Sequence, residues 1–175
     1  IAKTMLILLN TPHNPTGRVF TIEEMQCIPD LAIEHDLMVV TDEVYEHLVF
    51  DGAQHVAMAA LPGMRERTLI ISSGGKTFNT TGWKVGWLCG PARLVQSART
   101  AKQFLTYVSS GPFQPAIAVG LGLPDEFFAG VAADLQAKRD RLMPGLLEAG
   151  FEVFHTSGTY FVTADIRPLQ PDGDG

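Results

Sequence analysis

The stretch Ser72–Trp87, SSGGKTFNTTGWKVGW, places Lys76 after a run of small residues and a second lysine, Lys84, eight residues later. This setting is consistent with a phosphate-binding loop, with covalent attachment of a cofactor, or with an ordinary turn. A lysine that forms an imine must lose its proton at neutral pH, which requires burial or a cationic neighbour. Lys84 could be that neighbour or could bind a phosphate itself. Ser73 and the glycine backbone could donate to the same phosphate.

A nucleotide-binding P-loop fits this stretch poorly. The pattern GxxxxGK[ST] requires a glycine at the position that Ile70 occupies. The residues that follow Thr77, FNTTGW, do not begin a helix cleanly. The run LMVVTD (37–42), which ends in an acid, also precedes the lysine, and this is the reverse of the usual order. The covalent lysine and the ordinary turn therefore remain.

Further polar residues follow the predicted strands. Asp42 ends one strand, and an acid there can pair with the ring nitrogen of pyridoxal phosphate (PLP). Tyr45, three residues later, lies on the same face of a helical turn, and Asn14 belongs to an NPTG turn. Taken singly, these features are explained at least as well without a site, by surface lysines at 76 and 84, a helix cap, a half-buried aromatic and a plain turn. Taken together with Lys76, at successive strand ends, they favour a binding site.

Strands and helices alternate along the chain. Apolar runs predict strands at 5–9, 37–41, 68–72 and 85–89, the first two of them buried on both faces. Helices are predicted at 21–35, 91–108, 115–121 and 124–150, followed by strands at 151–154 and 159–164. Pro144 predicts a kink or an early break in the last helix, and Gly150 its end. The alternation predicts an α/β fold with a largely parallel sheet, which binds ligands beyond the carboxyl ends of its strands.

Composition narrows the class of protein. Hydrophobic residues make up 46% and charged residues 18% of the 175 residues, as in a globular protein with a sizeable core. The net charge of −6 and the absence of a basic block argue against nucleic acid or an anionic membrane as partners. The two cysteines and the histidines lack metal or disulfide spacing, so we expect no metal. We expect a cytoplasmic protein, of which this chain is one piece.

Three motifs together resemble class I/II aminotransferases of PLP fold type I. They are HNPTG (13–17), VVTDEVYEHLVFDG (39–52) and SSGGKTFNTTGWKVGW (72–87), in the order of that family. The resemblance covers essentially the whole chain. It implies that Lys76 binds PLP covalently and then moves the proton of the substrate Cα. It also implies that Asp42 keeps the pyridine nitrogen of PLP protonated.

The resemblance implies roles for four more residues. Asn14 and Tyr45 would hydrogen-bond the ring oxygen of PLP, and Ser73 and Lys84 would bind its phosphate. Many family members carry arginine where this chain has Lys84. Lysine keeps the charge but lacks the bidentate fork of arginine.

The resemblance further implies how the chain is divided and what it binds. Residues 1–123 would belong to the large PLP-binding domain, and residues 124–175 to a connecting helix and the start of the small domain. The substrates would be an amino acid and a 2-oxo acid, and the full-length protein would be a homodimer. A glycine-rich phosphate loop, an aromatic that stacks on the cofactor ring and an arginine for the substrate carboxylate would lie outside this chain.

Similarities to two groups of aminotransferases concern the substrate. The segments KQFLTYVSSGPFQPAIA (102–118) and GTYFVTADIRPL (158–169) are similar to N-succinyldiaminopimelate aminotransferases of lysine biosynthesis. The form GWKVGW (82–87) resembles the branch of kynurenine, glutamine and methionine aminotransferases. A cysteine-conjugate β-lyase would share every site residue named above, and a PLP-binding regulatory domain is a further alternative.

Overall fold

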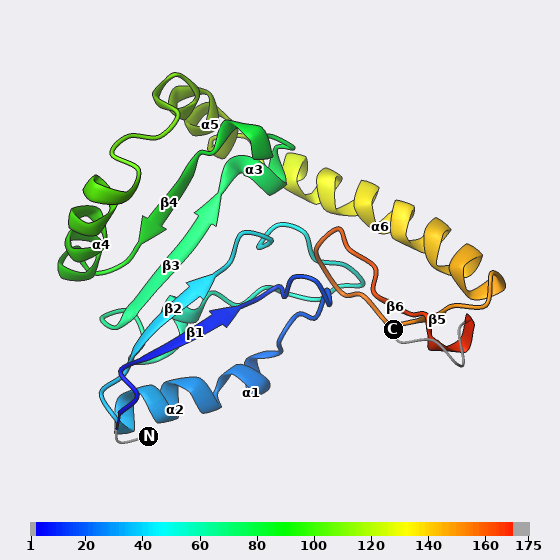
Figure 1. Cartoon of the computed structure of the whole chain (residues 1–175), viewed down its shortest axis with the longest axis horizontal. Helices are drawn as coiled ribbons and strands as arrows, with labels where there is room; N and C mark the ends of the chain where they lie inside the picture. The colour runs from blue at the N-terminus through cyan, green and yellow to red at the C-terminus, as the bar shows by residue number, and fades with distance from the viewer. Residues whose placement is uncertain (1–2, 170–175) are drawn as a thin grey trace.

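The computed structural model describes residues 3–169 of the chain. A four-stranded sheet in the order β1-β2-β3-β4 forms its centre (Figure 1). The strands are β1 (Leu6–Asn10), β2 (Met38–Asp42), β3 (Thr68–Ser73) and β4 (Gly86–Cys89). The first three are parallel, and β4 runs antiparallel to β3 at one edge. The predicted α/β fold with a largely parallel sheet is confirmed.

The first predicted helix is divided in two. The helices α1 (Ile22–Met25) and α2 (Cys27–Glu34) meet at Gln26. Thr21 caps α1 in a capping box, in which its hydroxyl accepts from the Glu24 amide at 3.3 Å. Pro29 explains the division, because it has no amide hydrogen to donate to the carbonyl four residues earlier and its ring crowds that carbonyl.

The main hydrophobic core lies between these helices and the first two strands. Its buried members are Met25, Ala32, Leu37, Val39, Met58, Leu61 and Met64. In β2, side chains alternate between fully and partly buried, whereas Leu6 and Leu8 of β1 are 43% and 71% exposed. The prediction that β1 is buried on both faces is therefore wrong. One face of β1 packs on the core, and its other face is open in the described part of the chain.

Three longer helices follow the sheet. They are α4 (Ala92–Leu105), α5 (Gln114–Leu121) and α6 (Asp125–Glu148), and Figure 1 shows α6 extending from the α3 end of the sheet toward the β5–β6 pair. The early break expected at Pro144 is absent, since α6 continues to Glu148. A proline removes one backbone hydrogen bond, and the turns on either side keep the helix continuous. Gly150 follows the helix at φ 92°, as predicted.

Short elements complete the fold. They are α3 (Gly74–Thr77) and the 3-10 helices η1 (Met58–Ala60), η2 (Thr81–Trp83), η3 (Gly111–Phe113) and η4 (Arg167–Leu169). The strands β5 (Glu152–Val153) and β6 (Ala164–Asp165) form an antiparallel pair. The strand predicted at 159–164 is wrong for most of its length. Its backbone instead bonds to the loop that follows β2, where the Thr159 amide donates to the Leu48 carbonyl at 2.8 Å.

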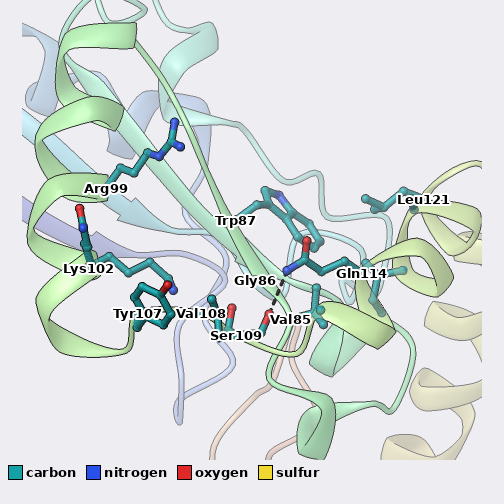
Figure 2. A pocket seen from close by; sticks show the side chains of 14 residues that line it. Val85, Gly86, Trp87, Arg99, Lys102, Tyr107, Val108, Ser109, Gln114 and Leu121 are labelled. Atoms are coloured by element: carbon teal, nitrogen blue, oxygen red, sulfur yellow. Dashed lines mark hydrogen bonds between the residues drawn. The ribbon is translucent and has the colours of Figure 1, made fainter.

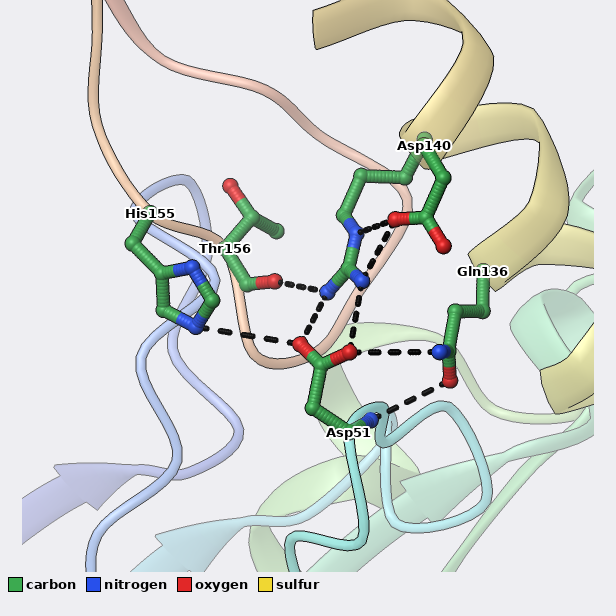
Figure 3. A network of polar contacts seen from close by, with 6 residues as sticks. Asp51, Gln136, Asp140, His155 and Thr156 are labelled. Atoms are coloured by element: carbon green, nitrogen blue, oxygen red, sulfur yellow. Dashed lines mark hydrogen bonds and ion pairs between the residues drawn. The ribbon is translucent and has the colours of Figure 1, made fainter.

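A polar network joins α6 and the segment around Thr156 to Asp51, which lies between β2 and β3 (Figure 3). The guanidinium of Arg139 in α6 makes two hydrogen bonds to the Asp51 carboxylate, at 2.6 and 2.8 Å. It also donates to the Thr156 carbonyl at 2.6 Å and to Asp140. Gln136 exchanges hydrogen bonds with Asp51 at 3.1 and 3.2 Å. Arg139 is only 8% exposed, whereas Asp51 and Asp140 are 39% and 54% exposed, so the network is a partly buried joint.

The predicted division at residues 123/124 falls in the turn between α5 and α6, and the two domains stay a prediction. Residues 1–2 and 170–175 of the predicted domain ranges lie outside the described residues. Within the described residues, no single helix is long and apolar enough to cross a membrane. The pair Gly111–Leu121 and Asp125–Glu148, bent by 97°, reaches the required length and composition only when taken together.

Candidate active site

The carboxyl ends of the parallel strands meet at one edge of the sheet. Asn10 pairs in register with Asp42, and Asp42 with Ile71, so the three strands end side by side. A cavity of about 670 Å³ opens there. Four residues predicted from the sequence line it, namely Asn14, Asp42, Tyr45 and Lys76. Residues up to 62 positions apart, Asn14 and Lys76, are thus brought to one place.

Asn14 is held by Asn10, the last residue of β1. The Asn10 side chain accepts from the Asn14 amide at 2.8 Å and donates to the Asp42 carbonyl at 2.9 Å. The Asn14 side chain in turn donates to the Tyr45 hydroxyl at 3.4 Å. Asn10 therefore links the ends of two strands and orients the NPTG turn. Sequence reasoning missed it, although an asparagine that ends a predicted strand was a usable signal.

Asp42 presents its carboxylate to the cavity from the end of β2. One carboxylate oxygen accepts from the Val44 amide at 3.1 Å. Among the described residues this is the only hydrogen bond recorded for that carboxylate. A half-buried acid with spare acceptor capacity is suited to bind a ligand N–H.

Tyr45 lies in the turn that follows β2, and its side chain is almost fully buried at 1% exposure. Its ring packs edge-on against Tyr160, with centroids 5.4 Å apart. Burial raises the pKa of the Tyr45 phenol, and the neighbouring Tyr160 hydroxyl raises this pKa further. Tyr45 therefore keeps its proton throughout the neutral range and remains a hydrogen-bond donor as well as an acceptor.

Lys76 belongs to α3, the single helical turn that follows β3. The hydroxyls of Thr80 and Thr81 donate to the carbonyls of Gly74 and Gly75, each at 3.0 Å, and hold this turn in place. A Cβ at Gly74 would come within 2.5 Å of the Ile117 side chain, so helix α5 can pack closely only against glycine. Gly74 of the motif thus serves the packing of α5 against this turn.

Ser73 and Lys84 are not among the residues that line this cavity. Ser73 pairs with Gly86 across β3 and β4, and Lys84 lies two residues before Gly86. Both therefore lie at the same end of the hairpin, where the Gly74 amide donates to the Val85 carbonyl at 3.2 Å. Lys84 is exposed and has a left-handed backbone with φ 55°. Their predicted role in phosphate binding stays a prediction.

The opposite side of the same strand end holds a second acidic cluster. Ligand atoms of Glu43, Glu46 and His55 lie within 4.8 Å of one another. Glu43 contacts His55 at 2.7 Å and accepts from the Met58 amide at 3.1 Å. Glu46 accepts from the Ser72 hydroxyl at 2.8 Å. Because the carboxylates already have partners in the protein, we interpret this cluster as structural packing.

A larger cavity of about 950 Å³ lies between β4, α4 and α5 (Figure 2). Arg99, Lys102 and Gln114 contribute its polar groups, and Trp87 and Tyr107 its aromatic rings. None of the residues predicted from the sequence lines it, and no acid does. Of these two cavities, the smaller one at the strand ends is the candidate active site, because it combines an amine, a carboxylate and phenol and amide donors.

The residues around the strand-end cavity fit PLP by their chemistry. Lys76 offers the amine that PLP requires, and Asp42 has an acceptor free for the ring nitrogen. Asn14 and Tyr45 offer donors for a ring oxygen. The fold and these groups together define a PLP-binding α/β protein.

Comparison with known proteins gives the family. The model of aminotransferase class I and II matches residues 1–172. The chain is 52% identical over 170 residues to a probable N-succinyldiaminopimelate aminotransferase of Mycobacterium tuberculosis. It is 44% identical over 178 residues to kynurenine–oxoglutarate transaminase 3 of Rattus norvegicus. These alignments cover 97% and 98% of this chain, and 43% and 39% of the relatives.

Solved structures agree with this result. The N-succinyldiaminopimelate aminotransferase of Mycobacterium tuberculosis superposes with a TM-score of 0.94 at 51% identity, over 97% of this chain and 44% of that one. YbdL of Escherichia coli, described with a methionine aminotransferase function, gives 0.87 at 36% identity, over 95% and 44%. The chain belongs to the class I and II aminotransferases, a PLP-dependent family, and spans about two fifths of the length of these relatives.

Proposed function

We propose that the protein carrying this chain is an aminotransferase that moves an amino group between an amino acid and a 2-oxo acid. The observation that carries the proposal is the meeting of Lys76, Asp42, Tyr45 and Asn14 in one cavity at the carboxyl ends of parallel strands. When bound, PLP supplies an electron sink for the electrons of the substrate Cα–H bond.

Each residue has a defined task in this proposal. Lys76 binds the cofactor through its ε-amino group and then, as general base and acid, moves the substrate Cα proton. The Asp42 carboxylate accepts the N–H of the cofactor ring and keeps that proton in place by its charge. Asn14 and Tyr45 orient the ring through hydrogen bonds, and Ser73 and Lys84 bind the phosphate.

We propose N-succinyldiaminopimelate as the amino donor, which would place the enzyme in lysine biosynthesis. The mycobacterial relative, similar over nearly the whole chain, supports this substrate. Kynurenine is the second candidate, and the similarity to kynurenine–oxoglutarate transaminases supports it. Both candidates use the same cofactor residues, so the choice depends on parts of the protein beyond these residues. We further propose that the full-length protein is a cytoplasmic homodimer. Within each chain, residues 1–123 would belong to the large domain and residues 124–175 to the connecting helix and the start of the small domain.

The test uses the full-length protein loaded with PLP. N-succinyldiaminopimelate, kynurenine and methionine are each supplied with 2-oxoglutarate, and the formation of glutamate is measured. We expect the highest kcat/KM with N-succinyldiaminopimelate and no turnover by Lys76→Ala. A higher kcat/KM with kynurenine would support the second candidate.

A parallel assay separates transamination from elimination. A cysteine conjugate is supplied without any 2-oxo acid, and the release of pyruvate and ammonia is measured. Release that exceeds every amino transfer would contradict the proposal and make the protein a β-lyase. Lys76→Ala serves as the blank in both assays.

A further inference from the structure

The segment of residues 156–163 is held by hydrogen bonds to two loops, one at residues 48–50 and one at Gly17. On one side, the amides of Phe50 and Thr159 make 2.8 Å hydrogen bonds across a short antiparallel bridge between Val49 and Gly158. On the other side, the Ser157 amide donates to the Gly17 carbonyl at 3.0 Å. These hydrogen bonds therefore hold the segment against the loop that follows β2 and against the NPTG turn.

Two glycines make that close approach possible. Gly17 adopts φ +68°, and a Cβ there would lie 2.8 Å from the Gly158 carbonyl. A Cβ at Gly158 would lie 2.8 Å from the Leu48 carbonyl and 2.9 Å from Val19. Neither position accepts a side chain without a shift of backbone. The register of the segment, and thus the place of Tyr160 two residues later, is set by these contacts.

Tyr160 is brought by this segment to the reactive lysine. The Nζ atom of Lys76 lies 5.5 Å from the centroid of the Tyr160 ring and 5.9 Å from that of Tyr45. The two rings stand nearly perpendicular to one another, at 81°. Phe161 packs against Tyr160 with centroids 4.7 Å apart, which supports the ring from the side. Lys76 thus has two aromatic neighbours: Tyr45, which follows β2, and Tyr160, which lies beyond α6 in the chain.

Other titratable groups also lie around Lys76. Asp42, Tyr45 and His13 line the strand-end cavity with it. A neighbouring cavity of about 480 Å³, which Lys76 also borders, is lined by Glu126, Asp134 and Lys138 of α6. Asp134 and Lys138 pair with each other at 2.5 Å. Against these charged groups, Tyr160 contributes a neutral ring whose face attracts a cation at distances up to about 6 Å.

We propose that Tyr160 is a positioning residue for Lys76, whose ring attracts positive charge at Nζ and limits the directions open to the lysine side chain. The inference rests on the proposed function, because the group at Nζ matters once the cofactor is attached there. A residue that follows α6 in the chain would then help to position the lysine at the sheet edge. The phenol hydroxyl is not required for this role, since the attraction comes from the ring face.

The test follows the absorbance of PLP bound to Lys76 in the full-length protein as pH is varied. Tyr160→Ala removes the ring, and we expect the midpoint of the spectral change to fall by about half a pH unit. Tyr160→Phe keeps the ring and should restore the wild-type midpoint. Phe154→Ala removes a half-exposed ring from the same C-terminal part and should leave the midpoint unchanged.

The outcomes separate this inference from the proposed function. Tyr160 is 40% exposed, so we expect Tyr160→Ala to fold, and its thermal unfolding is measured alongside. A midpoint in Tyr160→Ala equal to that of the wild type would overturn the inference and leave the proposed function intact. An equal shift in Tyr160→Phe would overturn the role of the ring. A wild-type protein that attaches no PLP to Lys76 would overturn both.

Discussion

Asp42 and Glu43 are adjacent carboxylates at the end of one strand, and they lie in very different surroundings. Asp42 borders the cavity and accepts one hydrogen bond from the chain, from the Val44 amide. Glu43 is 1% exposed and contacts both His55 and the Met58 amide. Successive side chains of a strand point to opposite faces, so a single strand end supplies both sides.

The hydrogen-bond partners of a carboxylate separate a group that can bind a ligand from a group that serves packing. A buried polar group is expected to have its hydrogen bonds satisfied, as Glu43 does. A carboxylate that faces a cavity with acceptor capacity left over is available to a ligand, as Asp42 is. The chemical nature of the two residues is almost the same, and the difference lies in their partners.

The largest effect is expected on the cavity side. Asp42→Asn removes the charge that holds the proton on the cofactor ring nitrogen. Loss of one preorganised electrostatic partner lowers kcat by on the order of 100- to 1,000-fold. We expect such a loss in amino transfer, with the urea unfolding midpoint close to that of the wild type. A variant that unfolds early would place Asp42 with the packing groups instead.

Glu43→Gln is the matched change on the packing side. It leaves the buried His55 and Met58 partners imperfectly paired, which costs about 3 kcal/mol in the free energy of unfolding. Activity per folded molecule, measured well below the unfolding midpoint, should stay within about threefold of the wild type. Unchanged stability together with a large loss of activity would reverse the assignment of the two sides.

A smaller effect is expected at the joint between the two parts. The Arg139 guanidinium holds the pKa of the Asp51 carboxyl below its usual range. The stabilisation is therefore complete above the ordinary pKa of about 3.9 and is lost as pH falls through the lowered value. Because Asp51 is 39% exposed, we expect Asp51→Asn to cost only about 1 kcal/mol at pH 7.

Unfolding of the wild type and of Asp51→Asn is compared at pH 7 and at pH 3 or below. The two stabilities should converge as the pH falls. A difference that persists at the lowest pH would show that the carboxylate charge does not cause the effect. Asp36→Asn, at a carboxylate that is 96% exposed, is the control and should change little at either pH.

Tyr45→Phe gives the smallest expected change in stability. Burial raises the pKa of the Tyr45 phenol, so its contribution is complete below the ordinary value of about 10 and is lost above it. The wild type should lose stability between pH 9 and 11, and the Phe variant should lose less. Thermal unfolding across this range measures the difference. Parallel curves for the two proteins would contradict burial as the cause.

Much of the site was predictable because its residues follow strands. Asn14, Asp42, Tyr45 and Lys76 come after apolar runs of parallel-strand type, and the carboxyl ends of such strands share one edge. The positions of Ser73 and Lys84 outside the cavity depend on the antiparallel return of β4, which periodicity does not reveal.

The remainder depended on contacts between distant segments. Tyr160 reaches Lys76 because residues 157–159 bond to 48–50 and not to a strand of their own, and no local pattern encodes this choice. The same contacts explain why the strand predicted at 159–164 is wrong. The exposed side chains of β1 likewise depend on what covers the sheet, since an apolar run alone gives no information about its neighbours.

The covalent role of Lys76 is tested by reducing the PLP-loaded full-length protein with borohydride and locating the modified residue by peptide mass spectrometry. We expect one pyridoxyl group, on Lys76, with Lys84 unmodified. Lys76→Ala should lose both the modification and the visible absorbance of the bound cofactor. Modification of Lys84 in the wild type, or retention of the bound cofactor's absorbance in Lys76→Ala, would show that Lys76 is not the residue that binds the cofactor.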